Sequence, residues 1–242
     1  MNGLLGEVLA AHGGERWGAV SAITARGRLG GLLPTRFPGD RLARFSVSVE
    51  IAEQRTILHD FPQVGRRGVL DRGSVRIETH DGALIETRDD PRSAFSGLSG
   101  VRRNVRWDPL DTAYFAGYAF WNYLNAPFLL ARDEIAVTEL EPSSERGRTG
   151  RRLRATFPAG LHTHCREQTF HVGPDGLIHR HDFVAEPVGR WAAAALRCDE
   201  YREFDGLFLA TRRRVHPRGP GGRVLAHPTL LALDFDEIEV QR

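Results

Sequence analysis

The segment from Asp108 to about Leu124 predicts a helix that the rest of the chain has to enclose. Asp108 suits the N-cap, Pro109 suits the first helical position, and Asp111 places negative charge where the helix dipole favours it. Asn125-Ala126-Pro127 should end the helix, because proline cannot continue it. Apolar side chains cover nearly its whole circumference, so the helix must be buried. We expect it to plug the hollow of a curved sheet.

The rest of the chain is predicted to form mainly strands separated by turns. Phe45 to Ile51 alternate between apolar and polar residues, as in a half-buried strand. A short amphipathic helix begins the chain and ends at Gly13-Gly14. Further strands are expected over Val20–Leu29, Gln54–His59, Gly68–Leu70, Val75–Thr79, Ala83–Thr87, Glu134–Leu140, Arg152–Phe157, Ala192–Tyr201, Leu207–Val215 and Leu230–Val240. The predicted fold is mainly β (α+β): a curved antiparallel sheet, or incomplete β-barrel, with the apolar helix on its concave side, as a single domain over residues 1–242.

Composition and charge narrow the classes of function. A net charge of +2 provides no basic surface for nucleic acid. All 33 basic residues are arginines, which excludes Schiff-base chemistry on lysine. No segment reaches the ~20 apolar residues of a membrane-spanning helix, so no integral membrane association is expected. Two cysteines, Cys165 and Cys198, and an N-terminus without the features of a signal peptide predict a cytoplasmic protein. The sequence leaves the oligomeric state open.

Residues 161–185 concentrate titratable side chains. Five of the ten histidines lie here: His162, His164, His171, His179 and His181. Gly173-Pro174-Asp175-Gly176 predicts a tight turn between two strands. A three-residue loop would place His171 opposite His179 and Glu167 on the same face as His181. A two-residue loop would shift the register by one residue and group His179 and His181 with His164, Gln168 and Phe170.

Two kinds of chemistry follow from these alternatives. In the first, His181 moves protons, Glu167 orients it or accepts the proton, and His179 and His164 complete the catalytic set. His179 and His181 are the preferred pair because they share a face in both registers. In the second, His171, His179 and His181 hold a metal ion, since paired histidines on adjacent strands lie ~5 Å apart.

Aromatic and amide side chains on the predicted helix and hairpin are candidates for binding a ligand. Tyrosine and tryptophan combine an apolar ring with a polar tip that fixes orientation, and a buried amide must find hydrogen-bond partners. The candidates are Tyr114, Tyr118, Trp121, Asn122, Phe170 and Phe183.

The order of the predicted elements resembles that of the LolA-like bacterial lipoprotein-carrier half-barrels. A helix is followed by strands, a buried helix and more strands. The local sequence that carries the resemblance is Phe204-Asp205-Gly206-Leu207-Phe208-Leu209-Ala210-Thr211-Arg212-Arg213-Arg214. The resemblance covers most of the chain and implies a concave, apolar-lined cavity able to hold a hydrophobic guest.

Three functional hypotheses follow. We favour a metal-independent acid/base enzyme of the cyclase, isomerase or lyase type, without a cofactor, acting on a hydrophobic or amphipathic small molecule. The alternative is a non-catalytic carrier of a lipid or hydrophobic metabolite. The second alternative is an enzyme that depends on a histidine-bound metal.

Overall fold

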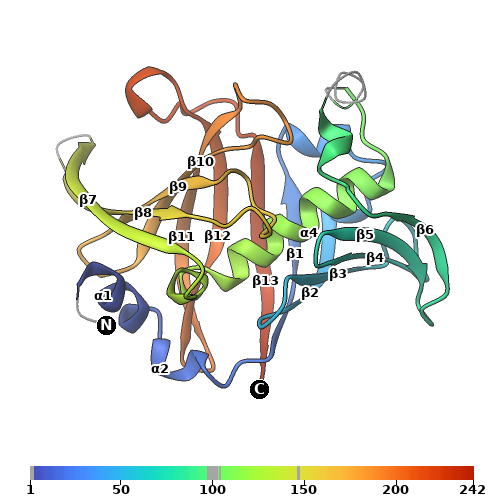
Figure 1. Cartoon of the computed structure of the whole chain (residues 1–242), viewed down its shortest axis with the longest axis horizontal. Coiled ribbons are helices and arrows are strands. Elements are labelled where there is room, and N and C mark those ends of the chain that lie inside the picture. Colours follow the sequence, from blue (N-terminus) through green and yellow to red (C-terminus); the bar gives the residue numbers. More distant parts are fainter. Residues whose placement is uncertain (1–2, 97–102, 104, 146–147) are drawn as a thin grey trace.

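The computed structural model describes residues 3–96, 103, 105–145 and 148–242. They form one curved antiparallel sheet of 13 strands that remains open (Figure 1). The strands are β1 (Ala22–Gly30), β2 (Arg44–Glu50), β3 (Arg55–His59), β4 (Arg66–Asp71), β5 (Ser74–Thr79), β6 (Leu84–Arg88), β7 (Ala136–Glu145), β8 (Arg148–Thr156), β9 (Glu167–Val172), β10 (Ile178–Val184), β11 (Ala193–Phe204), β12 (Leu207–Pro217) and β13 (Leu231–Gln241). β6 and β7 are its two edges, and β1 pairs with β13 in the middle. The predicted fold class is confirmed.

The long helix, α4 (Pro109–Asn125), crosses the concave side of the sheet (Figure 1). The Asp108 carboxylate accepts a hydrogen bond from the Asp111 backbone N–H at 2.7 Å, and the Asp111 carboxylate accepts one from the Asp108 backbone N–H at 3.1 Å. This reciprocal capping box satisfies two of the N–H groups that a helix start leaves unpaired. Every residue from Leu110 to Asn125 is buried. The predicted buried helix is confirmed.

The other helices are short. α1 (Leu4–Ala11) and α2 (Gly14–Trp17) lie at the end of the sheet where the C-terminus also lies (Figure 1). Single 3₁₀ turns occur at η1 (Leu33–Arg36), η2 (Arg41–Ala43), η3 (Ser93–Phe95), η4 (Phe128–Ala131) and η5 (Pro220–Gly222). In the described part of the chain, no helix combines the length and the hydropathy required to cross a bilayer.

The helix packs mainly against β2–β5, which is one half of the sheet. Two glycines allow this close approach. A Cβ added at Gly117 would lie 2.8 Å from Leu70 Cβ, and one added at Gly68 would lie 3.0 Å from Ala113 Cβ. Real Cβ atoms rarely approach other atoms this closely, so both positions require glycine, which has no side chain. The helix is therefore held toward β4 rather than centred in the sheet.

We predict that Gly117→Val destabilises the fold. The added side chain would overpack the contact with Leu70, which costs about 1–3 kcal/mol of unfolding free energy. For a chain of this size, that lowers Tm by roughly 3–10 °C. Differential scanning calorimetry measures the change. Gly160→Val is the matched control, because a Cβ at Gly160 meets no atom within 4 Å. Equal Tm values for the two variants would contradict the close packing of α4.

Candidate functional site

A cavity of about 520 Å³ lies between α4 and the half of the sheet formed by β10–β13. Because α4 packs mainly on β2–β5, space remains on its opposite side. The volume falls within the usual range for small-molecule sites. The cavity is lined by Leu32, Leu33, Thr35, Arg36, Val105, Phe115, Tyr123, His164, Phe183, Ala185, Val188, Trp191, Ala192, Ala193, Ala194, Val215, Pro217, Arg218, Leu230 and Leu231.

Small side chains on one strand make room for the cavity. Ala193 and Ala194 begin β11, Ala192 directly precedes them, and all three line the wall. On the neighbouring strand β10, Phe183 pairs with Ala194 and supplies a flat apolar surface. Across the space, α4 contributes Phe115. The wall is therefore apolar and shaped to accept a hydrocarbon group.

The cavity opens at the end of the sheet that carries the long loops. Three of its lining residues are large apolar side chains that remain exposed: Leu32 at 54%, Val105 at 78% and Trp191 at 73%. The β10–β11 loop that carries Trp191 lies at the end opposite to α1, α2 and the C-terminus (Figure 1). Clustered exposed apolar side chains typically mark a binding surface. Here they form the rim of the cavity.

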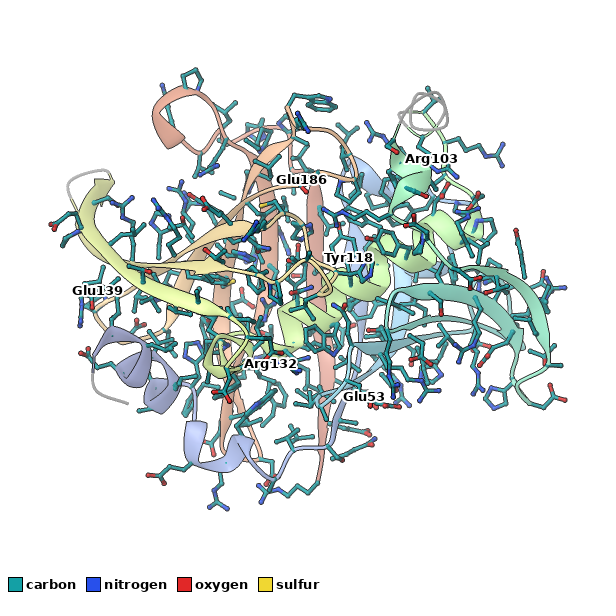
Figure 2. The ribbon with its side chains drawn as sticks, viewed as in Figure 1. Glu53, Arg103, Tyr118, Arg132, Glu139 and Glu186 are labelled. Atoms are coloured by element: carbon teal, nitrogen blue, oxygen red, sulfur yellow. The ribbon has the colours of Figure 1, made fainter. Side chains whose placement is uncertain are left out.

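A neutral histidine contributes to the inner wall of the cavity. His164 Nδ1 lies 3.2 Å from the Tyr118 hydroxyl, and His164 Nε2 lies 2.9 Å from the Tyr123 hydroxyl. The imidazole stacks on the Phe183 ring, with centroids 3.9 Å apart. Burial lowers the pKa of His164 well below its usual value. The neutral ring donates one hydrogen bond and accepts the other, so both nitrogens are satisfied. Figure 2 shows Tyr118 near the centre of the molecule.

The predicted turn of the histidine hairpin is confirmed, but its register is not maintained. Gly176 has a φ of 78°, and the Gly173 N–H donates to the Leu177 carbonyl at 2.9 Å, as in the three-residue loop. A bulge between Ile178 and Arg180 then shifts the pairing by one residue. The prediction that His179 and His181 share a face is therefore wrong. The bulge at His179 interrupts the alternation of the strand, so His179 is exposed while His181 is buried.

The bulge separates the three histidines that were candidates for a metal site. His179 is exposed and bonds to Asp175 at 2.8 Å, whereas His171 bonds to Asp182 at 3.1 Å, opposite Arg180. His181 is buried. The predicted triad does not assemble, and no other group of three or more histidine, cysteine or acidic side chains suited to a metal ion occurs among the described residues.

His181 is buried, but it does not line the large cavity. It bonds through Nε2 to the Gln168 side-chain oxygen and stacks on Phe170, with centroids 4.2 Å apart. Burial lowers the pKa of His181 to about 3, so the ring is neutral. Glu167 is exposed and lies next to Gln168 on β9, so its side chain points to the opposite face. The predicted pairing of His181 with Glu167 is wrong, because the register shift moves His181 to the face of Gln168.

The six predicted ligand-binding residues fall into two groups. Phe183 lines the large cavity, whereas Phe170 lines a small void of about 20 Å³ beside His181. The four helix residues are occupied by internal contacts. The Tyr114 hydroxyl bonds to His162 Nδ1, the Tyr118 hydroxyl to His164 Nδ1, the Trp121 N–H to the Glu50 and Glu53 carbonyls, and the Asn122 amide to the Tyr118 and His162 carbonyls.

Sequence reasoning missed most of the residues that line the cavity. Phe115 and Tyr123 lie on the long helix but were not among the predicted ligand-binding residues. The consecutive alanines Ala192–Ala195 were the available signal, because a strand with such small side chains leaves space beside it. Arg36 and Arg218 carry no local signal, since each stands in a loop whose position depends on the assembled sheet.

Comparison with solved structures identifies the fold. No protein-family model matches the sequence, and no curated protein matches it. A LolA superfamily protein from Nitrosomonas europaea matches with a TM-score of 0.55 and 13% identity, over 98% of this chain and 94% of that one. A domain from Vibrio parahaemolyticus, named for outer membrane lipoprotein sorting, matches with a TM-score of 0.51 and 10% identity, over 98% and 91%. The chain has a LolA-like fold, and the predicted architectural resemblance is confirmed.

The predicted cytoplasmic location is contradicted by these similarities. The Vibrio parahaemolyticus domain is named for outer membrane lipoprotein sorting, which points away from the cytoplasm. The cysteine content that supported the prediction does not discriminate between compartments. Cys165 and Cys198 are both buried and free, and buried thiols of this kind are inert in either environment.

We predict that His181→Asn changes how stability depends on pH. Because burial lowers the folded-state pKa of His181 to about 3, the unfolded chain binds an extra proton below the usual value of 6.5. This group therefore destabilises the fold as pH falls from 6.5 toward 3, by about 2 kcal/mol at pH 5. The stability gap between the wild-type protein and the variant should thus be smaller at pH 5 than at pH 7.5, as measured by urea unfolding.

Ile178→Val is the control for this experiment. Ile178 is buried on the same strand but does not titrate, so its substitution should lower the unfolding free energy equally at both pH values. If the His181→Asn gap is also the same at pH 5 and pH 7.5, His181 is not buried as a neutral ring.

Proposed function

We propose that this protein binds one hydrophobic or amphipathic small molecule in the cavity between α4 and β10–β13, and that it carries the molecule without converting it. The observation that carries the proposal is the open cavity of about 520 Å³ with apolar walls and an exposed apolar rim. Burying hydrocarbon in such a space contributes ~25 cal/mol for each Å² of apolar surface removed from water.

The geometry of the polar groups favours a carrier over an enzyme. Both nitrogens of His164, the titratable group deepest in the wall, already bond to tyrosine hydroxyls. His181 is enclosed by Gln168 and Phe170, and His179 is exposed. A general acid or base needs a free position within hydrogen-bond reach of the reacting atom. His164, the imidazole that lines the described cavity, has no such free position.

The solved structures of the same fold are consistent with a lipid-like guest. The Vibrio parahaemolyticus domain is named for lipoprotein sorting, and the Nitrosomonas europaea protein for the LolA superfamily. We therefore propose a lipid or a hydrophobic metabolite as the class of guest.

We predict that Ala194→Trp blocks binding. Ala194 is buried in the cavity wall opposite α4, so an indole there would occupy the space of the guest. The affinity for a neutral naphthylamine dye, measured by fluorescence titration, should fall at least about tenfold, since each ~1.4 kcal/mol of steric overlap corresponds to a factor of ten. Ala136→Trp on the exposed face of edge strand β7 is the control and should bind as the wild-type protein does.

Circular dichroism should show both variants folded. If Ala194→Trp binds the dye as tightly as the wild-type protein, the cavity is not the binding site. Mass spectrometry of molecules extracted after incubation separates carriage from catalysis: a carrier returns the added molecule with its mass unchanged.

A further inference from the structure

Among the described residues that line the cavity, the two charged side chains are both arginines. They are Arg36 on η1 and Arg218 just after β12. No aspartate or glutamate occurs among the described lining residues. Glu186 follows the lining residue Ala185, but its carboxylate pairs with Arg92 at 2.6 Å. The charge that borders the apolar space is therefore positive.

Arg218 retains unused hydrogen-bonding capacity. Its Nη1 donates to the Asp182 carboxylate at 2.9 Å, and the same carboxylate accepts hydrogen bonds from Arg180 at 2.6 and 2.8 Å. Arg218 Nε is buried and has no hydrogen-bond partner among the described residues. Nε itself is sealed off, but 25% of the Arg218 side-chain surface is exposed and the residue lines the cavity. An oxyanion in the cavity can therefore accept a hydrogen bond from the accessible part of the guanidinium.

Arg36 is the second positive group. Unlike Arg218, it has no carboxylate partner in the described chain. Its backbone is fixed, because the Trp107 N–H donates to the Arg36 carbonyl at 2.8 Å and the Leu33 N–H donates to the Leu230 carbonyl at 2.8 Å. The guanidinium makes no hydrogen bond or ion pair with a described residue, although the side chain is half-buried. Partial burial lowers its pKa from the usual value, which indicates that its charge is incompletely solvated. The cation is positioned but not neutralised.

The inner wall, as far as its residues are described, carries no comparable charge. The titratable lining groups there are His164 and Tyr123, which bond to each other at 2.9 Å. Burial keeps the imidazole neutral by lowering its pKa, and raises the pKa of the Tyr123 hydroxyl well above its usual value. A charged group on a guest would lose its hydration there without gaining an opposite charge. Among the described lining residues, it would find opposite charge at Arg36 and Arg218.

We infer that the cavity selects amphiphiles with an anionic head group, which Arg36 and Arg218 bind while the apolar chain lies against Phe115, Phe183 and the alanines of β11. The shared chemistry of the head is an oxyanion, a carboxylate or a phosphate, because guanidinium groups bind both by charge-assisted hydrogen bonds. This inference rests on the proposed function and adds the class of ligand.

The test compares ligands that share one C14 chain and differ only in the head: tetradecanoate, tetradecyl phosphate, tetradecanol and tetradecyltrimethylammonium. Each displaces the neutral naphthylamine dye at pH 8, low ionic strength and concentrations below micelle formation. The protein variants are Arg36→Gln, Arg218→Gln and the double variant. Arg44→Gln is the matched control, because Arg44 is exposed and does not line the cavity.

We predict that at least one oxyanion binds more tightly than the alcohol, and that the cation binds least. Each cavity variant should weaken oxyanion binding about tenfold, the effect of one charge-assisted hydrogen bond, and should weaken binding of the dye and the alcohol by much less. A circular dichroism spectrum that matches the wild-type spectrum shows that the variant is folded. Arg44→Gln should match the wild-type protein with every ligand. The difference between the carboxylate and the phosphate identifies the head group.

Two failures are distinguishable. If the wild-type protein binds neither the dye nor any C14 ligand, the proposed function fails. If it binds the dye and the alcohol, but the oxyanions bind no better than the alcohol or do not respond to either arginine substitution, the inference about the head group is overturned and the cavity remains a site for neutral apolar guests.

Discussion

The structure depends on burying α4, a helix whose polar groups must all find partners inside the protein. A buried polar group without a hydrogen bond is strongly destabilising. At the helix start, Asp111 is fully buried and pairs with Arg88 of β6 at 2.7 Å. Near the helix end, Arg213 of β12 donates to the Tyr123 carbonyl at 2.9 Å, where the helix dipole favours a cation. The two ends of the helix are thus attached to opposite halves of the sheet.

The position of this helix determines where the cavity lies. Contacts through Gly68 and Gly117 hold α4 close to β4. On the other half of the sheet, the alanines at the start of β11 are small and do not reach across the space. An asymmetric helix in a curved sheet therefore leaves a hollow on one side only. The hollow is a consequence of side-chain size, and it needs no strained or irregular backbone.

Local signals predicted the elements of this fold, but not the contacts between distant ones. The N-cap at Asp108 and the turn at Gly176 depend on neighbouring residues, and both are observed. The register of the hairpin depends on the bulge at His179. That bulge lets His181 reach Gln168 and Phe170 inside the sheet, which a turn sequence does not encode. The cavity walls were predictable only in part, since their residues come from the helix, four strands and several loops.

The buried histidines show how charge is distributed around the cavity. A neutral imidazole offers one donor and one acceptor, so His164 links two tyrosines of α4 to the segment before β9 without a buried charge. A protonated ring at the same place would lose its hydration and gain no carboxylate partner. The same physics applies to a guest: its charged end is destabilised beside His164 and stabilised beside Arg36 and Arg218. A guest bound as we propose would therefore lie with its charged end at the arginines and its apolar end against His164 and Phe183.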